Sequence, residues 1–222
     1  SRNGELHMEH AIFFDMDGTL FQTNLILEPA LEATFEQLRT NNLWSGETPL
    51  KLYRDIMGVP LPIVWEKLCP MHSDATREAS NAFFQQALIH EIEQGTGALY
   101  TGVEETLAQL SEKFPLYIAS NGQLPYLNAI VEHFALHRYI QKVYSIEGIR
   151  SGNKSELVAN ALKEQRITSG FVVGDRASDI AAAVDNGLVS IGVCFDFSQA
   201  SELKKADHIV PHFDKLVSII LK

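Results

Sequence analysis

The stretch Ala11-Ile12-Phe13-Phe14-Asp15-Met16-Asp17-Gly18-Thr19 decides the fold and the chemistry of this chain. Its four leading apolar residues predict a short strand that is buried on both faces, as in a parallel sheet. Two carboxylates, Asp15 and Asp17, follow at the end of that strand. Since burying an unpaired carboxylate costs several kcal/mol, a divalent cation is the obvious compensation, and a carboxylate beside a cation can act as a nucleophile. A plain Asp-Gly turn is the alternative that this stretch alone leaves open.

The rest of the chain divides into a helical part and an alternating part. Helical spacing of apolar residues, with Asn, Gly and Pro as stops, predicts helices from residue 28 to the Asn41-Asn42 pair and over 50–57, 63–68 and 74–93, the last capped by Asp74. From Gly102 onward, short apolar runs predict strands over 116–119, 142–145, 171–173, 189–193 and 208–210. Between and around them, helices are predicted over 103–113, 124–134, 154–165, 177–186 and 214–221.

Strands that alternate with helices predict an α/β fold, in which a doubly wound, Rossmann-like parallel sheet is covered on both faces. The early helices would form an insert between the first strand and the next part of the sheet. We therefore expect a core domain of residues 8–21 and 98–222 and a helical domain of residues 22–97.

Composition limits the classes of partner. The chain has 222 residues and a formal net charge of −10, from 28 acidic and 18 basic residues. This balance argues against nucleic acid or an anionic membrane surface as a partner. No apolar run is long enough to span a bilayer and no signal peptide is visible, so a cytoplasmic protein is expected. Cys69 and Cys194 are expected to be free, at least partly buried thiols. Residues 1–7 are expected to be foreign, with Met8 as the native start.

Polar residues gather where several predicted strands end. Asp15 and Asp17 follow the first strand, and the segment Ser120-Asn121-Gly122 follows the second. Asp175, with Asp179 four residues later, follows the strand at 171–173, and Lys154 begins a helix. Ligands of open parallel sheets bind at the carboxyl ends of the strands, so these groups are expected to form one site.

These motifs, in this order and spacing, resemble those of the haloacid dehalogenase-like hydrolase superfamily. The segments that carry the resemblance are Asp15-Met16-Asp17-Gly18-Thr19-Leu20, Ser120-Asn121, Lys154, and Gly174-Asp175 with Asp179. The insert resembles the helical cap of that family, and the subgroup that looks most similar is the phosphoglycolate-phosphatase-like phosphatases. The resemblance covers nearly the whole chain and implies a phosphoric monoester hydrolase.

The resemblance also implies roles for the acidic residues and the lysine. Asp15 would be the nucleophile that forms an aspartyl-phosphate, and Asp17 the general acid and then the general base. Asp15 and Asp175 would ligate Mg²⁺, with the backbone carbonyl of Asp17 also facing the ion. Asp179 would lie one turn away, accepting from a metal-bound water or from Lys154. Lys154 would neutralise charge on the nucleophile and the phosphate.

Other residues would hold the substrate. The resemblance places Ser120 and the Asn121 backbone N–H on the phosphoryl oxygens, with Gly122 in the same loop. Gly18 would allow close backbone approach, and Thr19 would orient the group beside it. From the residues alone, Arg54 is a candidate for gripping the remote end of the substrate, with a solvated surface role as the alternative. The expected partner is a small phosphorylated metabolite, and the chain would be a monomer or homodimer.

Several activities are compatible with this superfamily. Asp17 favours phosphoryl chemistry over halide displacement, since dehalogenases lack this second acidic residue. A phosphonatase would need a cap lysine as Schiff base, and Lys51 and Lys67 are the available residues. A sugar phosphomutase would carry a histidine at the start of the cap, which the segment 21–27 lacks. Phosphatase activity is the prediction, and a mutase, a phosphonatase or a catalytically idle regulatory binding protein remain alternatives.

Overall fold

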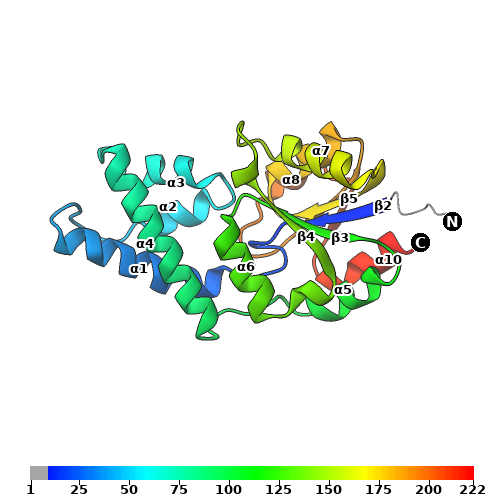
Figure 1. Ribbon diagram of the computed structural model, residues 1–222, viewed down its shortest axis with the longest axis horizontal. Helices are drawn as coiled ribbons and strands as arrows, with labels where there is room; N and C mark the ends of the chain where they lie inside the picture. The colour runs from blue at the N-terminus through cyan, green and yellow to red at the C-terminus, as the bar shows by residue number, and fades with distance from the viewer. Residues whose placement is uncertain (1–9) are drawn as a thin grey trace.

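A six-stranded, entirely parallel sheet forms the centre of the molecule (Figure 1). The computed structural model describes residues 10–222, so the expectation about residues 1–7 and Met8 lies outside the described residues. In spatial order the strands are β4 (Ile140–Ser145), β3 (Leu116–Ser120), β2 (His10–Phe14), β5 (Ser169–Gly174), β6 (Val189–Val193) and β7 (His208–Val210). The predicted parallel α/β sheet is confirmed, and β6 and β7 have the predicted bounds.

The first strand of the described residues, β2, lies in the middle of this sheet. Phe14 pairs with Ile118 of β3 on one side and with Val173 of β5 on the other, and the Asp15 N–H donates to the Val173 carbonyl (2.9 Å). This register aligns the carboxyl ends of the three strands. The segments that follow β2, β3 and β5 therefore leave the sheet beside one another.

Helices cover both faces of the sheet (Figure 1). On one face, α7 (Lys154–Gln165) and α8 (Ala177–Asp185) pack on alternate residues of the strands, such as Phe13 and Val172. On the other face lie α5 (Val103–Ser111), α6 (Leu124–His133) and α10 (Leu216–Ile220), packed on the alternate set, such as Phe14 and Val173. The predicted doubly wound arrangement is thereby confirmed.

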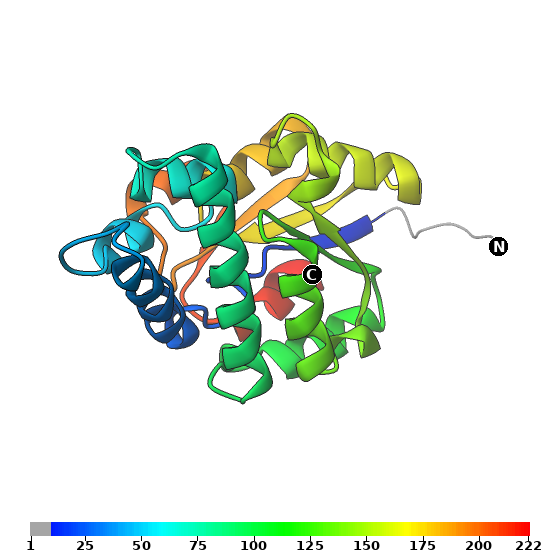
Figure 2. The same ribbon diagram turned by 60° about the vertical axis from the view of Figure 1, so that its left-hand side comes forward.

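A group of four helices lies beyond the carboxyl ends of the strands (Figures 1 and 2). These are α1 (Asn24–Thr40), α2 (Leu50–Asp55), α3 (Leu61–Leu68) and α4 (Asp74–Glu93), which we call the cap helices. Aromatic rings fill their interior, with the ring centroids of Phe35 and Trp65 6.0 Å apart and those of Trp65 and Phe84 5.8 Å apart. The domain bounds given above stay a prediction.

Two details of the cap helices differ from the sequence prediction. The first helix begins at Asn24 rather than at residue 28, because Ile26 and Leu27 are fully buried and extend its apolar face upstream of Pro29. The N-cap of α4 is Ser73 rather than Asp74, since the Ser73 hydroxyl accepts a hydrogen bond from the Thr76 N–H (3.1 Å).

The chain enters and leaves the cap helices through two segments that pair with each other. Phe21 and Leu99 form an antiparallel bridge, the Gln22 N–H donates to the Ala98 carbonyl (2.8 Å), and the Tyr100 N–H donates to the Leu20 carbonyl (3.0 Å). We call residues 20–22 and 98–100 the linker ribbon. It carries the cap helices as one insertion after β2.

The remaining elements are short. They are the four-residue helix α9 (Ala200–Leu203) and the 3-10 turns η2 (Leu136–Arg138), η3 (Ile146–Gly148) and η4 (Phe213–Lys215), and the predicted last helix is divided between η4 and α10. Cys69 is buried and Cys194 exposed, both free, so the expected burial of Cys194 was wrong: the residue lies just past the end of β6. Within residues 10–222, no helix is both long and apolar enough to cross a bilayer.

Candidate active site

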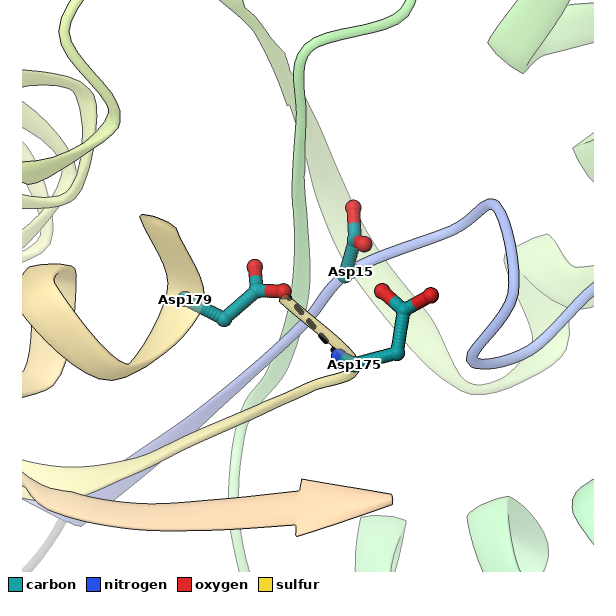
Figure 3. Close-up of side chains that lie close together, drawn as sticks. All are labelled: Asp15, Asp175 and Asp179. Carbon is teal, nitrogen blue, oxygen red and sulfur yellow. Dashed lines mark hydrogen bonds between the residues drawn. The ribbon is translucent and has the colours of Figure 1, made fainter. Parts of the chain in front are cut away.

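Three carboxylates meet beyond the carboxyl ends of β2 and β5 (Figure 3). Asp15 follows β2, Asp175 follows β5, and Asp179 lies in the first turn of α8. One oxygen from each carboxylate lies within 4.8 Å of the others, and all three residues are buried. The sequence predicted this convergence, and such a cluster is costly unless positive charge offsets it.

Lys154 supplies one positive charge from the start of α7. The Asn153 side chain accepts from the Ser155 N–H (2.8 Å), which fixes the beginning of the helix. From there, the Lys154 Nζ donates to Asp15 Oδ1 (3.0 Å) and Asp179 Oδ1 (2.6 Å). Burial alone would lower the pKa of Lys154, but the charges of these two carboxylates raise it well above its ordinary value. The lysine is therefore a permanent cation in the site.

Asp179 also shapes the loop that carries Asp175. Its Oδ2 accepts from the backbone N–H groups of Asp175 and Arg176, both at 3.1 Å. Burial and the charge of Asp15 raise the pKa of Asp179 to about 6. Gly174 makes this contact possible, because a Cβ at that position would lie 2.0 Å from the Asp179 carboxyl carbon.

Asp175 is the carboxylate that the protein leaves without a partner. It is 1% exposed, and neither of its oxygens has a hydrogen-bond partner among the described residues. Burial, followed by the charges of Asp15 and Asp179, raises its pKa well above the ordinary value. Gly18, at φ +76°, allows the close approach, since a Cβ there would lie 2.3 Å from Asp175 Oδ2. Three carboxylates facing one ammonium group suit a divalent cation bound by oxygen ligands.

Asp17 lies in a separate environment. The hydroxyl groups of Thr23 (2.6 Å) and Tyr126 (2.5 Å) both donate to its Oδ1. Burial raises the pKa of Asp17, against the lowering effect of these two hydrogen bonds and the charge of Lys154. A carboxyl group with a raised pKa is suited to hold and release a proton. The metal role predicted for the Asp17 backbone carbonyl stays a prediction.

The loop after β3 reaches both the site and the cap helices. Ser120 is buried, and its Oγ accepts from the Gly122 N–H (3.0 Å). The Asn121 side-chain amide donates to the Gly58 carbonyl, in the loop after α2. Thr19 is fully buried, with no hydrogen-bond partner for its hydroxyl among the described residues. The roles predicted for Ser120, Asn121, Gly122, Gly18 and Thr19 in holding a substrate stay predictions.

A cavity of about 40 Å³ connects these residues to the cap helices. Asp15, Asp17 and the loop 120–123 line one side of it. The wall from the cap helices and their loops consists of Tyr53, Met57, Gly58, Val59, Leu61, Val64, Gln85 and Leu88. Arg54 is not among the lining residues, and its proposed grip on the substrate stays a prediction.

Sequence reasoning missed the residues that support the site from a distance. Thr23 and Tyr126 hold Asp17, and Gln85 lines the cavity from α4. Arg176 donates to the Met57 carbonyl and pairs with Glu202 (Nε to Oε1, 2.8 Å), joining the loop after β5 to the loop after α2. Arg176 directly follows Asp175 in the sequence, and this position could have identified it as a residue near the site. Thr23, Tyr126 and Gln85 belong to no motif.

Similar proteins were found at the level of family, sequence and structure. A family model for haloacid dehalogenase-like hydrolases matches residues 12–193. The chain is 24% identical to a 5'-nucleotidase of Pseudomonas aeruginosa, covering 87% of this chain and 86% of the relative. It is also 24% identical to a phosphoglycolate phosphatase of Vibrio vulnificus, over 95% of each chain.

Solved structures share the fold. The structure of CbbY from Rhodobacter sphaeroides in complex with phosphate superposes with a TM-score of 0.81 and 18% identity, over 93% of this chain and 96% of that one. A predicted phosphatase from Clostridium acetobutylicum has a TM-score of 0.78 and 24% identity, over 96% and 98%. The predicted resemblance, including the similarity to phosphoglycolate phosphatases, is confirmed. With four motifs assembled at one sheet edge and a family match over most of its length, the chain belongs to the haloacid dehalogenase-like hydrolases.

Proposed function

We propose that this hydrolase is a Mg²⁺-dependent phosphatase that cleaves a small phosphomonoester through an aspartyl-phosphate on Asp15. The observation that carries the proposal is the unpartnered, buried carboxylate of Asp175 beside Asp15. A cation would stabilise a carboxylate in this state. The phosphatase names of the similar proteins support the same activity.

The donor set suits Mg²⁺, because every candidate ligand is a carboxylate oxygen. Asp15 and Asp175 would hold the ion, and Asp179 would lie beside it. When bound, Mg²⁺ would neutralise charge on the phosphoryl oxygens during transfer.

The chain's own residues provide the nucleophile and the proton. Lys154 binds Asp15 Oδ1, which leaves the second oxygen of Asp15 to attack phosphorus. A new bond from oxygen to phosphorus forms as the bond to the ester oxygen breaks, and Asp17 donates its proton to the departing alcohol. In the second step Asp17 takes a proton from water, whose oxygen attacks the same phosphorus. Phosphate leaves and the Asp15 carboxylate is restored.

The alternatives have less support. A phosphonatase would need a lysine of the cap to form a Schiff base. The available residues, Lys51 and Lys67, are exposed and do not line the cavity. Against a catalytically idle protein, the pKa of Asp17 and that of the unpartnered Asp175 are both raised, and carboxyl groups with perturbed pKa values gather at functional sites. A cytoplasmic location and a monomeric or homodimeric state stay predictions.

Hydrolysis of p-nitrophenyl phosphate tests the proposal. We expect turnover with Mg²⁺, loss of turnover with EDTA, and recovery when Mg²⁺ is returned. Asp15→Asn should abolish turnover while the circular dichroism spectrum and thermal unfolding stay close to those of the parent. Undiminished turnover by Asp15→Asn would refute Asp15 as nucleophile, and metal-independent turnover would refute the cation site.

A further inference from the structure

We propose that the alcohol released by this enzyme is short, uncharged and hydroxylated, and that Gln85 of α4 hydrogen-bonds its hydroxyl group. The inference rests on the proposed phosphatase function and names the substrate class of the same site. Three features of the cavity carry it: its charge, the state of Gln85, and its size.

The cavity contains acidic groups and no cation. Among the described residues that line it, none is a lysine, arginine or histidine, whereas Asp15 and Asp17 both face it. Two cations, Lys154 and Arg176, line an adjoining cavity instead. Lys154 is occupied there by Asp15 and Asp179, and Arg176 by Glu202 and the Met57 carbonyl. A carboxylate on the leaving group would therefore be buried beside Asp15 and Asp17 with no cationic side chain of this lining to pair with, at a cost of several kcal/mol. An uncharged leaving group avoids this cost.

Gln85 is the amide that the cap helices present to the cavity, alongside Tyr53, which carries a hydroxyl group. Its side chain is 9% exposed, and its Oε1 has no hydrogen-bond partner among the described residues. A buried amide left unpaired costs about 1–3 kcal/mol, and a substrate that pairs with it removes that cost. The amide both donates and accepts, which matches a hydroxyl group.

The cavity is small, and most of the side chains that the cap helices and their loops contribute to it are apolar. Its volume of about 40 Å³ leaves room for a compact group, and Met57, Val59, Leu61, Val64 and Leu88 form the wall around Gln85. This surface suits a few carbon atoms with one hydroxyl group at the end. A group as large as a nucleoside exceeds this cavity and would have to extend into the adjoining cavity of about 370 Å³, which Met57, Gly58, Val59 and Asn121 also line.

Three phosphate esters of equal chain length test the charge of the leaving group and its hydrogen bond to Gln85 separately. Phosphoglycolate carries a carboxylate, 2-hydroxyethyl phosphate carries a hydroxyl group in its place, and ethyl phosphate carries neither. We expect kcat/KM for 2-hydroxyethyl phosphate to exceed that for phosphoglycolate by about 100-fold, from the unpaired charge. It should exceed that for ethyl phosphate by about ten-fold, from the hydrogen bond to Gln85. Equal values, or a preference for phosphoglycolate, would overturn the inference.

Substitutions at two adjacent glutamines test the assignment to Gln85. Gln85→Leu should reduce the preference for 2-hydroxyethyl phosphate over ethyl phosphate to about one. Gln86→Leu is the matched control, because Gln86 is exposed on the same helix and should retain the preference. Retention of the preference in Gln85→Leu would overturn the role of this residue. If all three esters and p-nitrophenyl phosphate fail with Mg²⁺ present, the proposed function itself falls, and this inference falls with it.

Discussion

Replacing Asp175 with asparagine is expected to stabilise the metal-free protein and to abolish its response to Mg²⁺. Asp175 is buried, its oxygens have no partner among the described residues, and the charges of Asp15 and Asp179 oppose its own. Asparagine has nearly the same shape without the charge. The substitution therefore removes a cost from the folded state and a ligand from the cation site.

The size of the gain follows from what is removed and what remains. An unpaired buried carboxylate costs several kcal/mol, but Lys154 offsets part of this cost at Asp175, and the amide that replaces it is a polar group that must also be buried. We expect a net increase of about 1–3 kcal/mol in the free energy of unfolding, or about 2–10 °C in melting temperature.

The gain should depend on pH in a defined direction. Burial and two neighbouring charges raise the pKa of Asp175 in the folded state above its unfolded value. The protonated carboxyl group is therefore favoured by folding, and its contribution to stability is lost as pH rises through the raised pKa. The advantage of Asp175→Asn should be smallest at low pH and should grow as the pH rises.

Urea unfolding in EDTA, repeated with Mg²⁺, measures both effects. Mg²⁺ at 100 times its dissociation constant should stabilise the parent by about 2.7 kcal/mol and leave Asp175→Asn unchanged. Asp214→Asn, at an exposed carboxylate, should behave as the parent does in both conditions. A metal-free Asp175→Asn protein that gains no stability over the parent as the pH rises would refute the reasoning.

Tyr126→Phe removes a hydrogen bond that lowers the pKa of Asp17, so the fall of kcat/KM at high pH should move to higher pH; a pH profile identical to that of the parent would contradict this. Gly170→Ala places a Cβ 1.9 Å from a backbone oxygen of β2 and should cost more than about 2 kcal/mol in urea unfolding, whereas Gly148→Ala, with open space around it, should cost little. Arg176→Met removes the contact to the loop after α2. In steady-state kinetics, kcat/KM should fall about ten-fold, mainly because KM rises, and a fall confined to kcat would contradict a role of Arg176 in holding that loop.

Local signals were sufficient for much of the fold. The helix over 74–93 and the strand over 189–193 were predicted with their observed bounds, because apolar periodicity and flanking Gly residues mark them. The early start of α1 was not predicted. A proline usually lies in the first turn of a helix, so Pro29 suggested a later start. The burial of Ile26 and Leu27 outweighs the loss of the backbone hydrogen bond that Pro29 cannot donate.

The site residues that directly follow the strands could be predicted from the sequence. Asp15 and Asp175 converge because β2 and β5 are neighbours in a parallel sheet, and this follows from the order of elements along the chain. Tyr126 and Gln85 could not be found in this way. Each lies on a helix whose rotation and distance from the site are set by packing, and neither has a sequence neighbour that carries chemistry.

The linker ribbon limits how the cap helices can move. Two single strands would let the inserted helices swing and twist in any direction, but the bonds between residues 20–22 and 98–100 tie the two crossings together. Two segments held together by hydrogen bonds resist sliding along each other. They can still bend perpendicular to the plane that the pair forms. Any movement of the cap helices would then be confined to one direction of bending, which keeps Gln85 aligned with the cavity that Asp15 also lines.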